Sequence, residues 1–363
     1  MSVLKELLDQ NCSDGVEYVR LGDVAEIGTG RSDRKDATED GEFPFFVRSE
    51  HVLRFPSFQF DEEALIIPGE GNVGEVFHYI NGKYALHQRA YRVHFLSDAV
   101  NCRFALYALE SHFKQYINKR AVSATVKSLR KPMITEFPLA VPPRAVQDKI
   151  VEYIDTFAAV CDNLDLEIEQ RERQLEALRF QLLQRFAVSH TDRAPLGDVV
   201  KITNGRDWKD QEPGEVPVYG SGGLMDARVA APAGVGPAVL LPRKGSLDVQ
   251  YVDGPFWNID TVFRTSVDET VLLPKFFYYA ASEFDLESIS TSSTRPSLTQ
   301  KALKKLVVPL PPLSVQQEIS DKLDTMQQLI DNLKHERELR GKQFEYYRSR
   351  LLDFTAKEPE DND

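Results

Sequence analysis

The same sequence pattern occurs twice in this chain of 363 residues. Leu21-Gly22-Asp23-Val24 returns as Leu196-Gly197-Asp198-Val199, an offset of 175 positions (21 to 196). Val141-Pro142-Pro143 returns as Leu310-Pro311-Pro312, an offset of 169 positions (142 to 311). A duplication of this length predicts two similar modules related by a pseudo-twofold axis, and a ligand that also has two halves.

A long helical pattern follows each pair of prolines. Apolar residues recur there at alternating spacings of three and four, which is typical of a coiled-coil seam. The seam residues are Ile150, Ile154, Phe157, Cys161, Leu164, Ile168, Leu175, Leu178 and Leu182, then Ile319, Leu323, Met326, Ile330, Leu333, Phe344, Tyr347 and Leu351. Arg171 and Arg340 interrupt the two stripes at matching positions. Each helix of about 40 residues is expected to be roughly 60 Å long at 1.5 Å per residue.

We call the segments before these helices module 1 (residues 17–140) and module 2 (residues 191–309). The first helix starts at module 1 and ends at module 2, whereas the second starts at module 2. Pairing of the helices therefore requires them to run antiparallel. The expected molecule is a dumbbell, with an intramolecular antiparallel coiled coil between two globular modules.

Each module is expected to be a mixed α/β domain with a twisted, largely antiparallel sheet. Strand-like runs with turn signals such as Asn81-Gly82 and Asp253-Gly254 favour this fold class. The expected strands are residues 63–68, 75–80 and 89–95 in module 1, and 238–241 and 248–252 in module 2. Short helices are expected over residues 104–117 and 274–282.

Local charge is more informative than the net charge of −12. Residues 111–135 and 288–317 contain no Asp or Glu, and they occupy matching places in the two repeats. Two acid-free windows in an acidic protein predict patches that face phosphates. Their basic residues are Lys114, Lys119, Arg120, Lys127, Arg130 and Lys131, then Arg295, Lys301, Lys304 and Lys305.

Polar and aromatic residues in Gly-containing loops complete the candidate DNA-binding set. Their side chains supply the donors and acceptors that read base edges, and glycine permits a close approach of the backbone. They are Arg31, Arg48, Ser49, His87, Gln88 and Arg89 in module 1, and Arg206, Trp208, Lys209, Tyr219, Ser221, Arg243, Lys244, Ser246, Trp257 and Asn258 in module 2. We interpret all of them as exposed loop residues.

No catalytic or metal site is predicted. Residues 69–74 match GxGxxG, but a strand-like run follows them where a dinucleotide site needs a helix. There is no GxxxxGK[ST] sequence, and the histidines show no ligand spacing. The scattered Cys12, Cys102 and Cys161 and the lack of a membrane segment favour a reducing cytoplasm.

The sequence resembles the specificity subunit of a type I restriction–modification system. The most specific part is residues 306–319, which is repeated more loosely over residues 137–150. Residues 216–223 and 242–246 are similar to one class of the family's target-recognition domains, and residues 43–49 and 86–91 resemble another. The chain departs from the family pattern at Arg144-Ala145-Val146.

The resemblance implies two target-recognition domains joined by two helical regions that fix the spacing of an asymmetric, bipartite DNA target. The implied segments are recognition domain 1 (17–140), helical region 1 (141–190), recognition domain 2 (191–309) and helical region 2 (310–356). An amphipathic pattern predicts an N-terminal helix within residues 1–16, and the acidic composition of residues 357–363 predicts a disordered tail. The resemblance also implies separate partner chains. These are two modification subunits that use S-adenosylmethionine, and restriction subunits that use ATP and Mg, with no cofactor in this chain.

Other functions stay open at this point. The partner could be a single chain that combines methyltransferase and nuclease. A self-contained endonuclease or methyltransferase is disfavoured because the catalytic motifs are missing. A coiled-coil scaffold without nucleic acid is disfavoured by the two matched acid-free windows.

Overall fold

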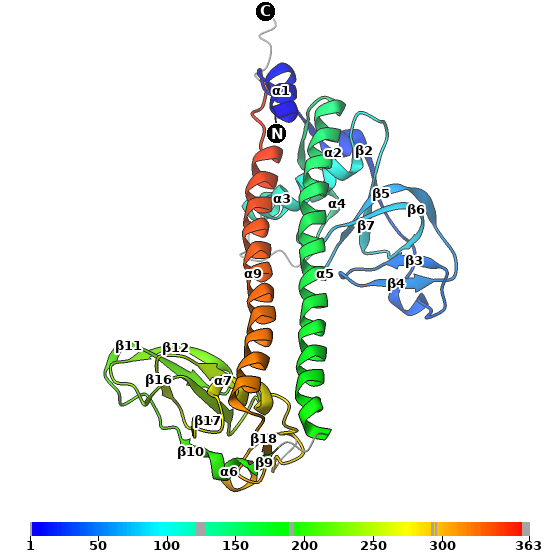
Figure 1. Ribbon diagram of the computed structural model, residues 1–363. Coiled ribbons are helices and arrows are strands. Elements are labelled where there is room, and N and C mark those ends of the chain that lie inside the picture. The colour runs from blue at the N-terminus through cyan, green and yellow to red at the C-terminus, as the bar shows by residue number, and fades with distance from the viewer. Residues whose placement is uncertain (1, 121–127, 189–191, 292–293, 295, 358–363) are drawn as a thin grey trace, which may run out of the picture. The chain divides into compact units, whose positions relative to one another are not determined.

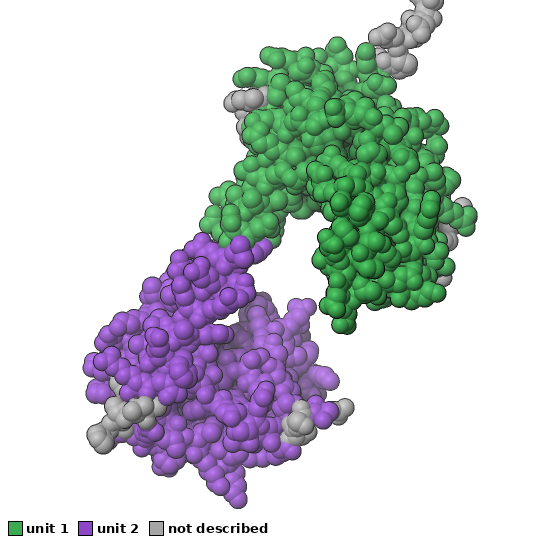
Figure 2. All heavy atoms as spheres, turned by 90° about the vertical axis from the view of Figure 1, so that its right-hand side faces the viewer, with its two compact units in different colours: residues 1–164, 336–363 green, residues 165–335 purple. Residues whose placement is uncertain are grey.

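The computed structural model describes residues 2–120, 128–188, 192–291, 294 and 296–357. It separates into two compact units (Figure 2). Unit 1 comprises residues 1–164 and 336–363 and contains module 1. Unit 2 comprises residues 165–335 and contains module 2. Within the described residues, no helix has the length and apolar character needed to cross a membrane.

Module 1 is built on a six-stranded sheet in the order β2-β7-β5-β6-β3-β4 (Figure 1). All neighbouring strands are antiparallel except β3 and β6. The strands are β2 (Ala25–Thr29), β3 (Phe43–Phe46), β4 (Val52–Phe55), β5 (Phe60–Pro68), β6 (His78–Leu86) and β7 (Ala90–Phe95). The expected mixed α/β fold with a largely antiparallel sheet is confirmed.

Alternating residues of β5 supply two cores. Leu65 and Ile67 belong to a cluster that contains Phe113 and Ile117 of α3 (Cys102–Arg120). Ala64 and Ile66 lie in a second cluster with Phe46 and Tyr84. Because successive strand side chains point to opposite faces, β5 is buried on both sides and stands at the centre of the module.

The prediction of a turn at Asn81-Gly82 is wrong. Strand β6 starts at His78 and continues through this dipeptide, with Asn81 opposite Glu63 and Gly82 opposite Glu62 on β5. The long neighbouring strand keeps the ladder going, and glycine accepts the local φ of +125°. The turn lies instead between Pro68 and His78, and no helix follows Gly74. The prediction that residues 69–74 form a loop is therefore confirmed.

Module 2 contains two four-stranded sheets, in the orders β10-β17-β14-β15 and β12-β11-β16-β13. Their neighbours are antiparallel except β11 and β16. The strands are β10 (Val200–Asn204), β11 (Pro213–Gly220), β12 (Gly223–Val229), β13 (Gly234–Val235), β14 (Ala238–Pro242), β15 (Gln250–Val252), β16 (Pro255–Asn258) and β17 (Val262–Val267). Val239 and Leu241 of β14 pack in a core with Phe276 and Phe277 of α7 (Pro274–Ala281).

Small paired elements begin and end each module. They are β1 (Glu17–Arg20) with β8 (Pro138–Val141) in module 1, and β9 (Arg193–Pro195) with β18 (Val307–Pro309) in module 2. The duplicated Leu-Gly-Asp-Val forms the short helices α2 (Leu21–Val24) and α6 (Leu196–Val199). A Cβ on Gly22 would lie 2.8 Å from Cβ of Thr135, and one on Gly197 would lie 2.9 Å from Cβ of Lys304. The repeated glycine thus permits close packing against α4 (Lys131–Thr135) and the residue after α8 (Gln300–Leu303).

The two long helices are α5 (Arg144–Val188) and α9 (Leu313–Leu352), of 45 and 40 residues. In unit 1 the start of α5 packs on the end of α9, and the rings of Phe157 and Tyr347 are 5.5 Å apart. In unit 2 the end of α5 packs on the start of α9, where Lys334 Nζ lies 2.6 Å from Glu172 Oε1. The expected antiparallel pairing is confirmed. The N-terminal helix α1 (Ser2–Asn11) joins the unit 1 cluster through Leu4.

Candidate nucleic-acid interface

Four loops of module 1 converge through backbone hydrogen bonds. These reading loops are residues 30–33, 47–51, 69–72 and 87–89. His87 holds two of them, since its carbonyl accepts from Gly30 N (3.3 Å) and its N–H donates to Phe46 O (2.9 Å). Gly69 N donates to Arg89 O at 3.0 Å. These hydrogen bonds bring loops from a stretch of 60 residues, 30 to 89, together at one site.

The glycine of the repeated Gly-Arg pair marks a close approach of two backbones. A Cβ on Gly30 would lie 1.6 Å from Leu86 O, and one on Gly205 would lie 1.9 Å from Ile259 O. No side chain fits at either position. The arginine that follows, Arg31 or Arg206, is exposed.

Arg48 and Arg89 share one carboxylate. Arg48 Nη1 donates to Glu70 Oε2 at 2.8 Å, and Arg89 Nη1 donates to Glu70 Oε1 at 2.6 Å. The hydrogen bond from Arg89, together with Arg48 and both positive charges, lowers the pKa of Glu70 below its ordinary value. Glu70 is therefore ionised at neutral pH and neutralises part of the positive charge of this site.

The other residues predicted in the module 1 loops differ in exposure. Gln88 is exposed and donates to Asp33 Oδ2 at 3.1 Å, and Ser49 is half-buried. His87 is only 3% exposed, so its interpretation as an exposed residue is wrong. Its Nδ1 accepts a hydrogen bond from Arg89 N at 2.9 Å, and burial lowers its pKa. Neutral His87 orders the loop that presents Gln88 and Arg89.

The first acid-free window contacts these loops at Ser128 and Leu129. Ser128 pairs with Glu70 in an antiparallel bridge, and Leu129 N donates to Gly69 O at 2.8 Å. Arg130 and Lys131, which follow directly, are exposed. Lys119 and Arg120 are exposed at the end of α3, where Arg120 lies 4.3 Å from the centre of the Tyr116 ring. Lys127 lies outside the described residues.

Module 2 brings together a corresponding set of loops, residues 205–209, 219–223, 243–248 and 258–261. Arg206 N donates to Asn258 O (3.1 Å), and Ile259 N donates to Tyr219 O (3.0 Å). Thr261 joins two further loops, since Arg243 N donates to its carbonyl at 2.9 Å and Ser221 N to its Oγ1 at 3.1 Å.

The side chains of these loops form a mixed surface. Arg206, Lys209, Lys244 and Ser246 are exposed, whereas Trp208, Tyr219, Ser221 and Arg243 are half-buried. Trp257 and Asn258 are buried, so their interpretation as exposed loop residues is wrong. They lie on the last two positions of β16, where Trp257 Nε1 donates to Arg206 O at 3.0 Å. Their role is to hold the Arg206 loop.

The second window meets its loops as the first does. Lys244 pairs with Ser297 in an antiparallel bridge, and Leu298 N donates to Arg243 O at 2.8 Å. Ser128 and Ser297 are 169 positions apart, so Lys244 occupies the place that Glu70 has in module 1. Lys301 and Lys304 are exposed, and Arg295 lies outside the described residues. The same frame therefore presents an acid in one module and a base in the other.

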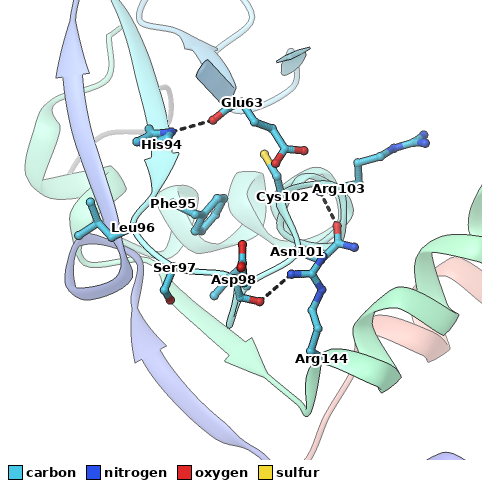
Figure 3. A pocket seen from close by; sticks show the side chains of 11 residues that line it. Glu63, His94, Phe95, Leu96, Ser97, Asp98, Asn101, Cys102, Arg103 and Arg144 are labelled. Atoms are coloured by element: carbon cyan, nitrogen blue, oxygen red, sulfur yellow. Dashed lines mark hydrogen bonds between the residues drawn. The ribbon is translucent and has the colours of Figure 1, made fainter. Parts of the chain in front are cut away.

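A cavity of about 350 Å³ lies where module 1 joins α5 (Figure 3). Its arginines are already engaged, since Arg144 Nη1 donates to Asp98 O at 2.6 Å and Arg103 pairs with Asp155 at 2.7 Å. Arg144, the departure from the family pattern, thus fastens the start of α5 to the connection after β7. Nothing in this cavity points to a catalytic centre, and the described residues contain no metal-binding group of His, Cys, Asp and Glu.

Comparison with known proteins gives consistent matches. A family model described as the type I restriction modification DNA specificity domain matches residues 13–177 and 192–339. The EcoDI specificity subunit of a type I restriction enzyme from Escherichia coli is 28% identical over 193 residues, which are 53% of this chain and 39% of that protein. A Mycoplasma pneumoniae protein, named as a type I specificity subunit, is 24% identical over 93% of this chain and 97% of its own length.

Two solved structures share the fold. The S subunit of a type I restriction–modification system from M. genitalium has a TM-score of 0.65 at 18% identity, covering 93% of this chain and 96% of that chain. A chain from a structural study of assembly and conformational transition of the type I R-M system has a TM-score of 0.59 at 15% identity, covering 93% of this chain and 97% of that chain.

Proposed function

Because this chain belongs to the family of type I restriction-modification DNA specificity proteins, we propose that it is the subunit that selects the DNA target and has no catalytic centre of its own. Each module reads one half of a bipartite sequence in double-stranded DNA. The loops contact base edges, and the exposed cations of the acid-free windows contact phosphates. We also propose that the protein acts in the cytoplasm, because its proposed ligand is double-stranded DNA.

The observation that carries this proposal is one backbone frame with two different sets of loop side chains. The glycine contacts at Gly30 and Gly205 and the bridges at Ser128 and Ser297 repeat, so the frames agree. Glu70 and Lys244 differ in charge at equivalent places. Two readers of unlike chemistry on a repeated frame favour an asymmetric target with two unlike half-sites.

The partners we propose are two copies of a modification subunit, which transfers methyl groups from S-adenosylmethionine to adenine, and restriction subunits that use ATP and Mg. Two identical partners need two equivalent docking surfaces. Val160 on α5 and Leu329 on α9 are 169 positions apart, and their exposed fractions are 39% and 40%. The two long helices thus carry a matched pair of exposed apolar residues, one in each unit.

The recognition proposal is tested by expressing the chain with its modification subunit in a host that lacks adenine methylation and mapping methylated adenines. One asymmetric bipartite motif is expected. Replacing residues 17–140 by the recognition domain of another family member should change one half-site and preserve the other. A change in both halves, or methylation without a motif, would contradict the assignment of one reader to each half.

The docking proposal is tested with Val160→Glu and Leu329→Glu. We expect each variant to bind one copy of the modification subunit instead of two, and the double variant to bind none. Asp61→Lys, at an exposed position of module 1, serves as the control that should retain both copies. Two bound copies in the double variant would place the docking surface elsewhere.

A further inference from the structure

We propose that Glu70 is a specificity-determining residue of module 1. Its carboxylate restrains Arg48 and Arg89 and thereby suppresses their binding to the phosphates of non-target DNA. This inference rests on the proposed role of the chain in DNA recognition. Glu70 would raise specificity by weakening binding to non-target DNA, and not by strengthening binding to the target.

The position of Glu70 suits this role. The Glu70 loop is fixed by backbone bonds on two sides, from Gly69 N to Arg89 O and from Leu129 N to Gly69 O. The arginines come from two other loops, and Glu70 therefore connects both candidate readers with the end of the acid-free window. The Glu70 carboxylate holds two loops that carry predicted DNA contacts, and the backbone of the Glu70 loop holds the acid-free window.

The two ion pairs restrain the arginines without locking them. Each guanidinium group gives only one nitrogen to Glu70, so its remaining N–H groups stay available. The side chains of Arg48 and Arg89 are 47% and 57% exposed, and exposed ion pairs contribute little free energy. A guanine edge offers two acceptors in the geometry of the guanidinium fork and can compete with the carboxylate. A phosphate can also match the fork, but non-specific phosphate binding depends mainly on net positive charge, and Glu70 neutralises part of that charge.

Module 2 lacks this restraint at the equivalent place. Lys244 stands there, and its Nζ lies 3.4 Å from Asp260 Oδ2. Removing the charge at the two equivalent positions should therefore have opposite effects. Loss of the Glu70 charge should strengthen binding to any DNA, whereas loss of the Lys244 charge should weaken it.

The experiment uses the purified full chain and two duplexes of equal length, one carrying the methylation motif and one of random sequence. Dissociation constants are measured over a series of salt concentrations for the wild type, Glu70→Gln, Glu70→Asp and Lys244→Gln. Asp61→Asn is the charge-matched control, because Asp61 is an exposed acid on β5 of module 1 that lies outside the four reading loops. Thermal unfolding verifies that each variant is folded.

For Glu70→Gln we expect about tenfold tighter binding to the random duplex, a salt dependence steeper by about one to two in the log–log slope, and about a tenfold smaller preference for the motif. Glu70→Asp, which keeps the charge, should resemble the wild type. Asp61→Asn should keep the wild-type preference, and Lys244→Gln should bind both duplexes more weakly.

Unchanged random binding and unchanged preference in Glu70→Gln would overturn the inference while leaving the recognition role intact. An equal loss of preference in Asp61→Asn would also overturn it, because net charge alone would then explain the effect. A wild-type chain with no preference for the motif duplex would instead reject the recognition role itself, and this inference with it.

Discussion

Gln147 and Gln316 make the same three hydrogen bonds in the two units. The side-chain oxygen of Gln147 accepts from Asn101 N, and its Nε2 donates to Ala99 O and Pro142 O, at 2.7–2.8 Å. Gln316 bonds in the same way to Leu273 N, Val271 O and Pro311 O, each at 2.8 Å. Both side chains are fully buried. Each glutamine fastens the start of a long helix to the module that precedes it.

We expect Gln147→Leu and Gln316→Leu each to lower the free energy of unfolding by about 2–4 kcal/mol, because several buried backbone groups lose their partners. Urea unfolding of the full chain measures this loss. Gln317→Leu is the control, since Gln317 is exposed and bonds only Asp321; its cost should be within about 0.5 kcal/mol. If Gln316→Leu and Gln317→Leu lowered the free energy of unfolding equally, burial would not explain the contribution of Gln316 to stability.

Gly30→Ala and Gly205→Ala should each damage one reader. The added Cβ overlaps the carbonyl oxygen of Leu86 at the end of β6, or that of Ile259, so the two backbones must separate. Such a distortion costs about 1–3 kcal/mol or more. We expect Gly30→Ala to lose discrimination at the half-site of module 1 only, and Gly205→Ala at the other only, measured with duplexes mutated in one half. Gly28→Ala is the control, because Gly28 lies on β2 outside the loops and its added Cβ would come no closer than 3.4 Å to the Arg92 side chain.

Folded-state burial should make the stability of module 1 depend on pH. Burial lowers the pKa of His87 and also of His78. The unfolded chain then binds protons more readily as the pH falls below about 6.5, and the free energy of unfolding decreases there. Asn in place of His87 keeps an acceptor for Arg89 N and cannot titrate. His87→Asn should therefore flatten the loss of stability between neutral and mildly acidic pH, with the His78 part remaining.

The measurement is urea unfolding at a series of pH values. A His87→Asn curve as steep as that of the wild type would indicate that His87 is protonated equally in the folded and unfolded chain.

The features that sequence predicted best are those carried by regular patterns. The stripe from Ile150 to Leu182 predicted α5 and its antiparallel partner because an exposed apolar stripe of that length must be covered. The Asn81-Gly82 turn failed because a local signal was outweighed by pairing with β5, which is a tertiary effect.

The candidate site was predictable in composition but not in detail. His87, Trp257 and Asn258 are polar or amphipathic residues in sequence, and only the packed structure shows that they are buried. The role of Glu70 was not predicted, because no sequence pattern marks a single loop acid as the partner of two distant arginines. Its role follows from contacts with Arg48 and Arg89, which lie 22 and 19 positions away.

The distance between the two half-sites should follow the length of α5 and α9. Inserting one helical heptad after Ile168 in α5 and another after Arg337 in α9 preserves the seam pattern on both sides, because these positions are 169 apart. The added helix is about 10 Å long, close to the rise of three base pairs at about 3.4 Å each. We expect the methylation motif to keep both half-sites and gain about three base pairs of spacer. An insertion in α5 alone should disrupt the helix pair and lower stability. An unchanged spacer in the double insertion would show that the helices do not set the distance.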